Sequence, residues 1–194
     1  MKATRMIAAA VLVLSGLIAP SQASAQGAFY IGGSAGKSDF GSDGANGRIT
    51  AGTVDATDTG FKIFGGYQSD KNSAVEIAYV DLGRARYSGS SRGNLVTDGK
   101  FEIRGINISG VGILDLHPSF AVLLKTGLFG WETKTSDVAN GVPFSEKGSF
   151  VLLSFGFGLS YKFTKHVSMR AEWEWFWVGV AAPTLLSIGI AREF

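Results

Sequence analysis

The feature that most constrains the fold is a two-residue alternation of apolar residues with small or polar ones. Such a period belongs to a β-strand whose two faces meet different surroundings. In one segment, for example, Phe155 and Phe157 alternate with Gly156 and Gly158. The pattern recurs in eight segments: 29–37, 61–68, 75–82, 101–114, 120–131, 150–163, 167–177 and 186–194.

The links between these segments alternate in length, which indicates how the strands are connected. Short links cover 69–73, 115–119 and 164–166, whereas long, Gly- and Ser-rich links cover 38–59, 83–100 and 132–149, with a shorter one at 178–185. Short turns on one side and long loops on the other are typical of outer-membrane barrels. We therefore predict an all-β, eight-stranded antiparallel up-and-down transmembrane β-barrel, with extracellular long loops and both termini in the periplasm.

The chemistry of the two strand faces favours a lipid environment over a soluble barrel. One face is rich in Phe, Leu and Trp, and the other is small or charged. A soluble barrel buries its apolar face, and its core could not consist of Glu, Lys and Arg. Inside a membrane barrel the charged face lines the lumen, and its candidate ion-pair network is Lys62, Glu76, Lys125, Arg170, Glu172 and Glu174.

The first residues have the pattern of a secretory signal peptide. Lys2 and Arg5 precede an apolar stretch, 7–18, that is too short for a membrane-spanning helix, and Ala23-Ser24-Ala25 provides a small-x-small cleavage site. We predict a signal peptide at 1–25 and a barrel domain at 26–194. Removing two of the 18 basic residues balances the 16 acidic ones, so net charge gives no argument for a nucleic-acid partner.

Several motifs resemble the outer-membrane protein A (OmpA-like) transmembrane barrel family over nearly the whole mature chain. They occur in the family's order and spacing: Phe64–Gln68, Glu76–Tyr79, Asp81–Arg84, Thr164–Trp175, Leu186–Ile190 and the terminal Phe194. The resemblance implies that Glu76 and Arg170 form the interior salt bridge of the family. It also implies that Gly189 and Phe194 belong to a C-terminal assembly signal.

The chain departs from the family pattern at three places. Arg192 stands where an aromatic residue usually precedes the final Phe by two positions. Val111 and Ser160 stand where a second interior acid–base pair would be expected. The resemblance does not extend to the peptidoglycan-binding domain of longer relatives, so no cell-wall tether is expected.

Two roles for the charged lumen remain open at the level of sequence. The Glu76–Arg170 pair could act as a gate that switches partners when ions pass, or the whole network could be a polar plug. Eight strands leave an interior that side chains nearly fill, which favours the plug. The sequence also predicts that the loss of Arg170 lowers stability more than the loss of Glu76. When Glu76 is lost, Arg170 still has two acidic residues on its own strand.

Enzymatic and metal sites find little support. His166 and Ser168 lie at a short turn with no acid placed to orient the histidine, so a lipid A-modifying hydrolase is the weakest alternative. No catalytic residue, metal or cofactor is expected. Trp131, Trp173, Trp175 and Trp177 are interpreted as an interfacial aromatic girdle.

The sequence as a whole predicts a non-enzymatic outer-membrane protein with a structural and surface-interaction role. A narrow, porin-like gated pore is the main alternative. Expected partners are outer-membrane lipid, lipopolysaccharide and the barrel assembly machinery, with no nucleic acid. The protein is expected to be a monomer, and nothing in the loops identifies a surface ligand.

Overall fold

A computed structural model describes residues 27–41, 51–91, 94–139, 142–178 and 182–194. The predicted signal peptide, 1–25, therefore lies outside the described residues. The described residues form nine strands: β1 (Ala28–Asp39), β2 (Ala51–Asp55), β3 (Thr57–Asp70), β4 (Ser73–Ser91), β5 (Asn94–His117), β6 (Phe120–Ala139), β7 (Val142–Lys162), β8 (Val167–Phe176) and β9 (Thr184–Glu193).

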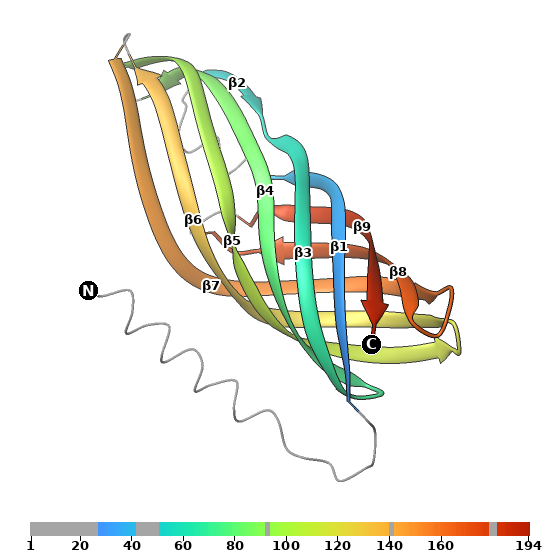
Figure 1. Ribbon diagram of the computed structural model, residues 1–194. Helices are drawn as coiled ribbons and strands as arrows, with labels where there is room; N and C mark the ends of the chain where they lie inside the picture. Colours follow the sequence, from blue (N-terminus) through green and yellow to red (C-terminus); the bar gives the residue numbers. More distant parts are fainter. Residues whose placement is uncertain (1–26, 42–50, 92–93, 140–141, 179–181) are drawn as a thin grey trace, which may run out of the picture.

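Eight of these strands close into an antiparallel barrel (Figure 1). Each strand pairs with the next, and β1 closes the ring by pairing with both β3 and β9. The short β2 does not count as a ninth strand of the barrel. It continues the line of β3 after a break at Ala56, and the two strands pair with successive parts of β4. The prediction of an eight-stranded up-and-down barrel is thus confirmed, and closure leaves no open sheet edge around the ring.

The long links are shorter than the sequence predicted, because the strands continue beyond the apolar alternation. Residues 83–91 and 94–100 pair as an extension of the β4–β5 hairpin, and 132–139 pairs with 142–149 across β6 and β7. Part of the first long link is β2. An apolar alternation marks only where one strand face meets lipid, whereas backbone pairing can continue where both faces are polar. The end with these extensions is called the hairpin end below, and the opposite end the turn end.

A bulge in β4 interrupts the alternation of its side chains. The register between β4 and β5 shifts between Asp81 and Arg84. Gly83 adopts a left-handed φ of 74°, and Arg84 N–H donates to Asp58 Oδ2 at 2.8 Å. Leu82 is buried before the bulge and Ala85 after it. The bulge therefore reverses which residues of β4 point outward.

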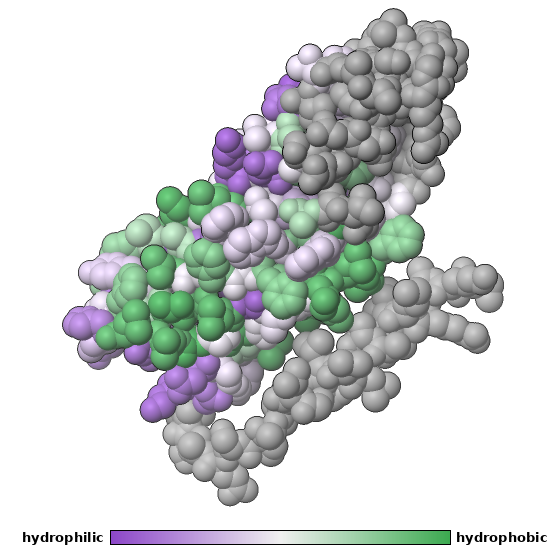
Figure 2. Space-filling model, turned by 180° about the vertical axis from the view of Figure 1, so that it is seen from behind, coloured by the Kyte–Doolittle hydropathy of each residue, from purple (hydrophilic) through white to green (hydrophobic). Residues whose placement is uncertain are grey.

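The outward surface is apolar around the turn-end half of the barrel. Figure 2 shows this band of hydrophobic side chains, with hydrophilic residues below and above it. Phe29, Ile188 and Phe157 are 66%, 65% and 44% exposed, respectively. This inverts the arrangement of a soluble barrel and suits a wall that faces lipid. No helix in the described ranges is long and apolar enough to span a membrane.

The interior has two layers. A charged layer lies in the middle of the barrel, and an apolar layer lies next to it on the side of the hairpin end. We call the second layer the apolar plug; its fully buried members are Val80, Leu82, Ile103, Phe129, Phe176 and Leu185. The expectation that the inward face is only small or charged was therefore wrong. These side chains lie on the same, inward-pointing face of the strands as the charged ones. The alternation of faces along a strand, here called parity, therefore does not distinguish the two layers.

Candidate functional site

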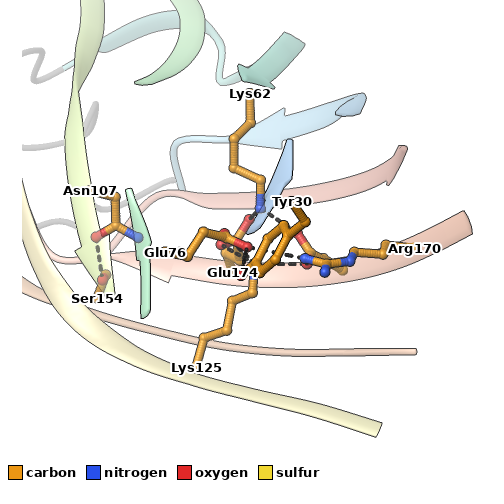
Figure 3. A network of polar contacts seen from close by, with 9 residues as sticks. Tyr30, Lys62, Glu76, Asn107, Lys125, Ser154, Arg170 and Glu174 are labelled. Atoms are coloured by element: carbon orange, nitrogen blue, oxygen red, sulfur yellow. Dashed lines mark hydrogen bonds and ion pairs between the residues drawn. The ribbon is translucent and has the colours of Figure 1, made fainter. Parts of the chain in front are cut away.

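The six predicted lumen residues come together in one buried cluster, the lumen network (Figure 3). They come from four strands: Lys62 from β3, Glu76 from β4, Lys125 from β6, and the remaining three from β8. None is more than 9% exposed. The network holds three cations and three carboxylates, so its formal charge is balanced.

Lys125 lies at the centre of the lumen network. Its Nζ lies 2.7 Å from Glu76 Oε1, 2.7 Å from Glu172 Oε1 and 3.9 Å from Glu174 Oε1. Because the ammonium group touches a carboxylate from β4 and two from β8, it ties opposite walls of the barrel together. A buried charge needs such partners, since its desolvation is otherwise costly.

Lys62 and Arg170 complete the network on either side of Lys125. Lys62 Nζ contacts the carboxylates of both Glu172 and Glu174. Arg170 Nη1 lies 3.1 Å from Glu76 Oε2 and 4.0 Å from Glu172 Oε1. The predicted pairing of Glu76 with Arg170 is therefore present in the structure, within a wider cluster in which each carboxylate has at least two cationic neighbours.

Two aromatic residues of the site were missed by the sequence reasoning. Tyr30 donates its hydroxyl hydrogen to Glu76 Oε2 at 3.1 Å, and its ring lies 4.6 Å from the Arg170 guanidinium carbon. The Phe64 ring lies 5.2–5.6 Å from all three cations. Both residues alternate with lipid-facing neighbours, so strand parity was the signal that could have placed them inward.

Glycines create the space that the large network side chains occupy. Gly66 lies beside the Tyr30 ring, where an added Cβ would come within 2.3 Å of Cζ. Gly158 pairs with Glu172 across β7 and β8, and a Cβ there would lie 2.9 Å from Glu172 Cγ. The alternating glycines of β7 thus accommodate the acidic side chains of β8.

The two sides of the network differ in access. Toward the hairpin end the apolar plug covers it, with the Phe129 and Phe176 rings 4.7 Å apart. Toward the turn end a cavity of about 50 Å³ reaches Tyr30, Ser160 and Arg170. Val111 and Ser160, which replace the expected second acid–base pair, are both buried on this side. This cavity brings the turn-end side of the barrel to Arg170.

The four tryptophans predicted to form an interfacial girdle do not share one orientation. Trp173 on β8 and Trp177, which directly follows β8, are 41% and 44% exposed, and Trp173 stacks on Trp175 at 4.6 Å. Trp131 departs from the prediction, because it is only 7% exposed and shares the inward parity of Lys125. The outward tryptophans form a stripe along one strand, since alternate residues of a strand follow its axis.

The predicted assembly residues lie where the barrel closes. Phe194 N–H donates to Phe29 O at 2.9 Å, which extends the β1–β9 pairing to the last residue. Gly189 lies opposite Ser34, and a Cβ would come within 2.3 Å of Gly33 O. Close packing of two strands is a sufficient reason for glycine at that position.

The two histidines lie apart from the lumen network. Both lie at the turn end, His117 as the last residue of β5 and His166 in the link between β7 and β8. His117 Nδ1 accepts a long hydrogen bond from Ser119 N–H, and His166 N–H donates to Thr164 Oγ1. Among the described residues, no group of three His, Cys, Asp or Glu could hold a metal ion.

The chain is similar to known membrane proteins in sequence and in fold. Residues 24–184 match the family model described as OmpA-like transmembrane domain. Outer membrane protein A of Klebsiella pneumoniae is 26% identical over 141 residues, and that of Shigella flexneri is 24% identical over 140. Each alignment covers 68% of this chain, but only 40% and 39% of the respective relatives.

Solved barrels of low sequence identity share the fold. OprG from Pseudomonas aeruginosa has a TM-score of 0.57 at 15% identity, covering 87% of this chain and 95% of that one. Neisserial surface protein A has 0.56 at 18% identity, covering 86% and 97%. Ail of Yersinia pestis has 0.55 at 15% identity, covering 87% and 97%. The chain therefore belongs to the OmpA-like transmembrane domain family and is a small bacterial outer-membrane β-barrel with a buried ion-pair network.

Proposed function

We propose that this protein is a non-conducting, non-enzymatic barrel that anchors its hairpin end at the bacterial surface and has a structural and surface-interaction role. In this proposal the turn end and both termini face the periplasm, while the hairpin end faces the outside. The wall lies among outer-membrane lipid and lipopolysaccharide, and the barrel assembly machinery inserts the chain as a monomer.

One observation carries the proposal: the lumen is filled by two successive layers. A hydrated ion would have to break a charge-balanced network in which Lys125 touches three carboxylates. It would then have to cross the apolar plug, whose Phe129 and Phe176 are fully buried. An unpaired ion in such surroundings is strongly disfavoured.

Planar-bilayer recording tests this proposal. We expect the wild-type protein to show no conductance above that of the bare bilayer. The double variant Phe129→Ala/Phe176→Ala should conduct, because it empties the plug beside the network. Leu124→Ala is the matched control, since Leu124 lies on the lipid-facing side of the same strand as Phe129 and is 58% exposed. Regular single-channel steps in the wild-type protein would refute the proposal.

A gated pore is the alternative with an observation in its favour. Because Lys125 already contacts acids from β4 and β8, it could exchange partners without a large movement. A gate of this kind predicts voltage-dependent openings in the wild type that disappear in Lys125→Met. A lipid A-modifying activity has no comparable support, and mass spectrometry of lipid A with and without the protein tests it.

A further inference from the structure

The bulge at Gly83 has a consequence for the outer surface of the barrel. Uninterrupted alternation from Glu76, through Val80, would point Arg84 and Arg86 into the lumen. Because the bulge reverses the faces, both arginines are exposed on the outside, while Ala85 and Tyr87 are buried. Bulges are a common means of redirecting side chains at the rim of a barrel.

Arg84 and Arg86 follow the bulge on β4, in the part of the β4–β5 hairpin that continues toward the hairpin end; Figure 1 shows these two strands extending to that end of the barrel. Below them on the same strands, Tyr79 and Ile106 are exposed neighbours in the register. Between the apolar residues and the arginines lies one mixed row, in which Arg104 is paired in register with Asp81 and with Glu132. The surface therefore changes from apolar to charged within a few residues.

The next two rows are predominantly basic. In one, Arg84, Glu102 and Lys134 lie side by side on β4, β5 and β6, and in the other Arg86 lies between Asp55 of β2 and Lys100 of β5. These rows hold four cations and two acids among the residues named. We call Arg84, Arg86 and Lys134 the basic patch.

The basic patch is weakly neutralised by the protein itself. Arg84 Nε lies 3.9 Å from Glu102 Oε1, and the two side chains are 48% and 40% exposed, so this pair contributes little. No acid among the described side chains lies within ion-pair distance of Arg86 or Lys134.

We infer that the basic patch binds the phosphate groups of lipopolysaccharide, with the acyl chains of the same molecule lying against the apolar wall below. The inference rests on the proposed outward orientation of the hairpin end. Two features select this partner: the cations are exposed, and an apolar wall that suits acyl chains lies one mixed row below them. Arginine suits the contact, because its planar guanidinium forms paired hydrogen bonds with phosphate oxygens.

The experiment measures adducts by native mass spectrometry of the folded full-length mature protein in detergent. The probes are phosphorylated lipopolysaccharide and the same preparation after chemical dephosphorylation. The test variant is Arg84→Gln/Arg86→Gln/Lys134→Gln. The control variant, Lys37→Gln/Lys162→Gln/Lys165→Gln, removes the same charge from exposed positions elsewhere on the barrel. Unheated gel migration verifies that each variant is folded.

We expect the wild type and the control to bind the phosphorylated probe, and the patch variant to bind it about tenfold more weakly, with binding that falls as salt rises. Equal binding by the patch and control variants would overturn the inference. So would equal binding of the dephosphorylated probe, which would indicate recognition of acyl chains alone. Equally tight binding of the phosphorylated core oligosaccharide without lipid would show that the patch takes soluble polyanions instead. None of these results depends on conductance, so the proposed function stands or fails separately.

Discussion

Arg170 and Glu76 lie 94 residues apart in the sequence and on opposite walls of the barrel, yet Arg170 Nη1 lies 3.1 Å from Glu76 Oε2. The contact fixes the distance across the lumen between β4 and β8. Because the Glu76 carboxylate also accepts hydrogen bonds from Tyr30 and Lys125, this contact is part of a shared network rather than an isolated pair.

Arg170→Ala should lower the free energy of unfolding by about 3–5 kcal/mol, because it leaves an excess negative charge in a buried site. Urea unfolding in lipid vesicles measures this loss. Arg192→Ala is the control, since Arg192 is an exposed arginine near the turn end of β9. Stability of Arg170→Ala equal to that of the wild type would show that the network does not act as a buried ion cluster.

The structure revises the sequence-based expectation for Glu76→Ala. Glu76 is the acid that accepts from Tyr30, Lys125 and Arg170, whereas Arg170 reaches Glu172 only at 4.0 Å. Removing Glu76 takes an acceptor from three donors, of which Lys125 keeps another carboxylate at 2.7 Å, so we expect a loss at least as large as that of Arg170→Ala. Urea unfolding under the same conditions compares them. A clearly smaller loss would favour the original expectation.

Lys62→Met should cost about 3–5 kcal/mol, because it keeps the length of the side chain but leaves Glu172 and Glu174 short of a cation. Adding Glu174→Gln should recover part of the loss by restoring the charge balance. A double-mutant cycle built from equilibrium unfolding measures the coupling. Additive effects of the two substitutions would contradict a direct interaction.

Acid should weaken the turn between β3 and β4. Ser73 Oγ donates to Asp70 Oδ2 at 2.6 Å and Asn72 N–H to Oδ1 at 2.7 Å, so these hydrogen bonds lower the pKa of Asp70 below its ordinary value of 3.8. A carboxylate with a lowered pKa stabilises the fold above the unfolded-state pKa and loses that contribution as the pH falls through the folded-state value. The difference in urea midpoint between wild type and Asp70→Asn should therefore shrink below about pH 4. A difference that is constant from pH 7 to the acid limit would disagree with this account.

Deleting Phe194 should reduce the yield of folded barrel. Its backbone N–H makes the last hydrogen bond of the β1–β9 closure, and its ring lies 5.3 Å from the Arg192 guanidinium carbon. Phe194→Tyr keeps both contacts and serves as the control. Membrane yield and unheated gel migration measure assembly, and wild-type values for the deletion would argue against a role in closure.

The mature protein should begin at Gln26, because Ala23-Ser24-Ala25 forms the cleavage pattern. Intact-mass measurement of the protein purified from outer membranes should show the loss of residues 1–25. A substitution of Ala25 by a bulky residue should impede processing. A full-length mass in the membrane fraction would refute the prediction.

The sequence by itself determined the barrel and most of its network. Period two is local, so the strand faces were readable, and Lys62, Glu76, Lys125, Arg170, Glu172 and Glu174 could be assigned to the inward face as a set. The family resemblance added the Glu76–Arg170 pair. The assignment of faces depends on a short-range pattern, which a chain keeps regardless of its tertiary environment, whereas the pair joins residues 94 apart and needed the resemblance.

The tertiary structure decided what parity leaves open. Phe129 and Trp131 share the inward face with Lys125, and only their height along the barrel places them in or beside the apolar layer rather than among the charges. The partners of each cation depend on the stagger of strands far apart in sequence, which alternation does not encode. Beyond the bulge at Gly83 the inward and outward faces of β4 are exchanged, so Arg84 points to the outer surface instead of into the lumen. A single inserted residue has this effect because successive side chains of a strand point to opposite sides.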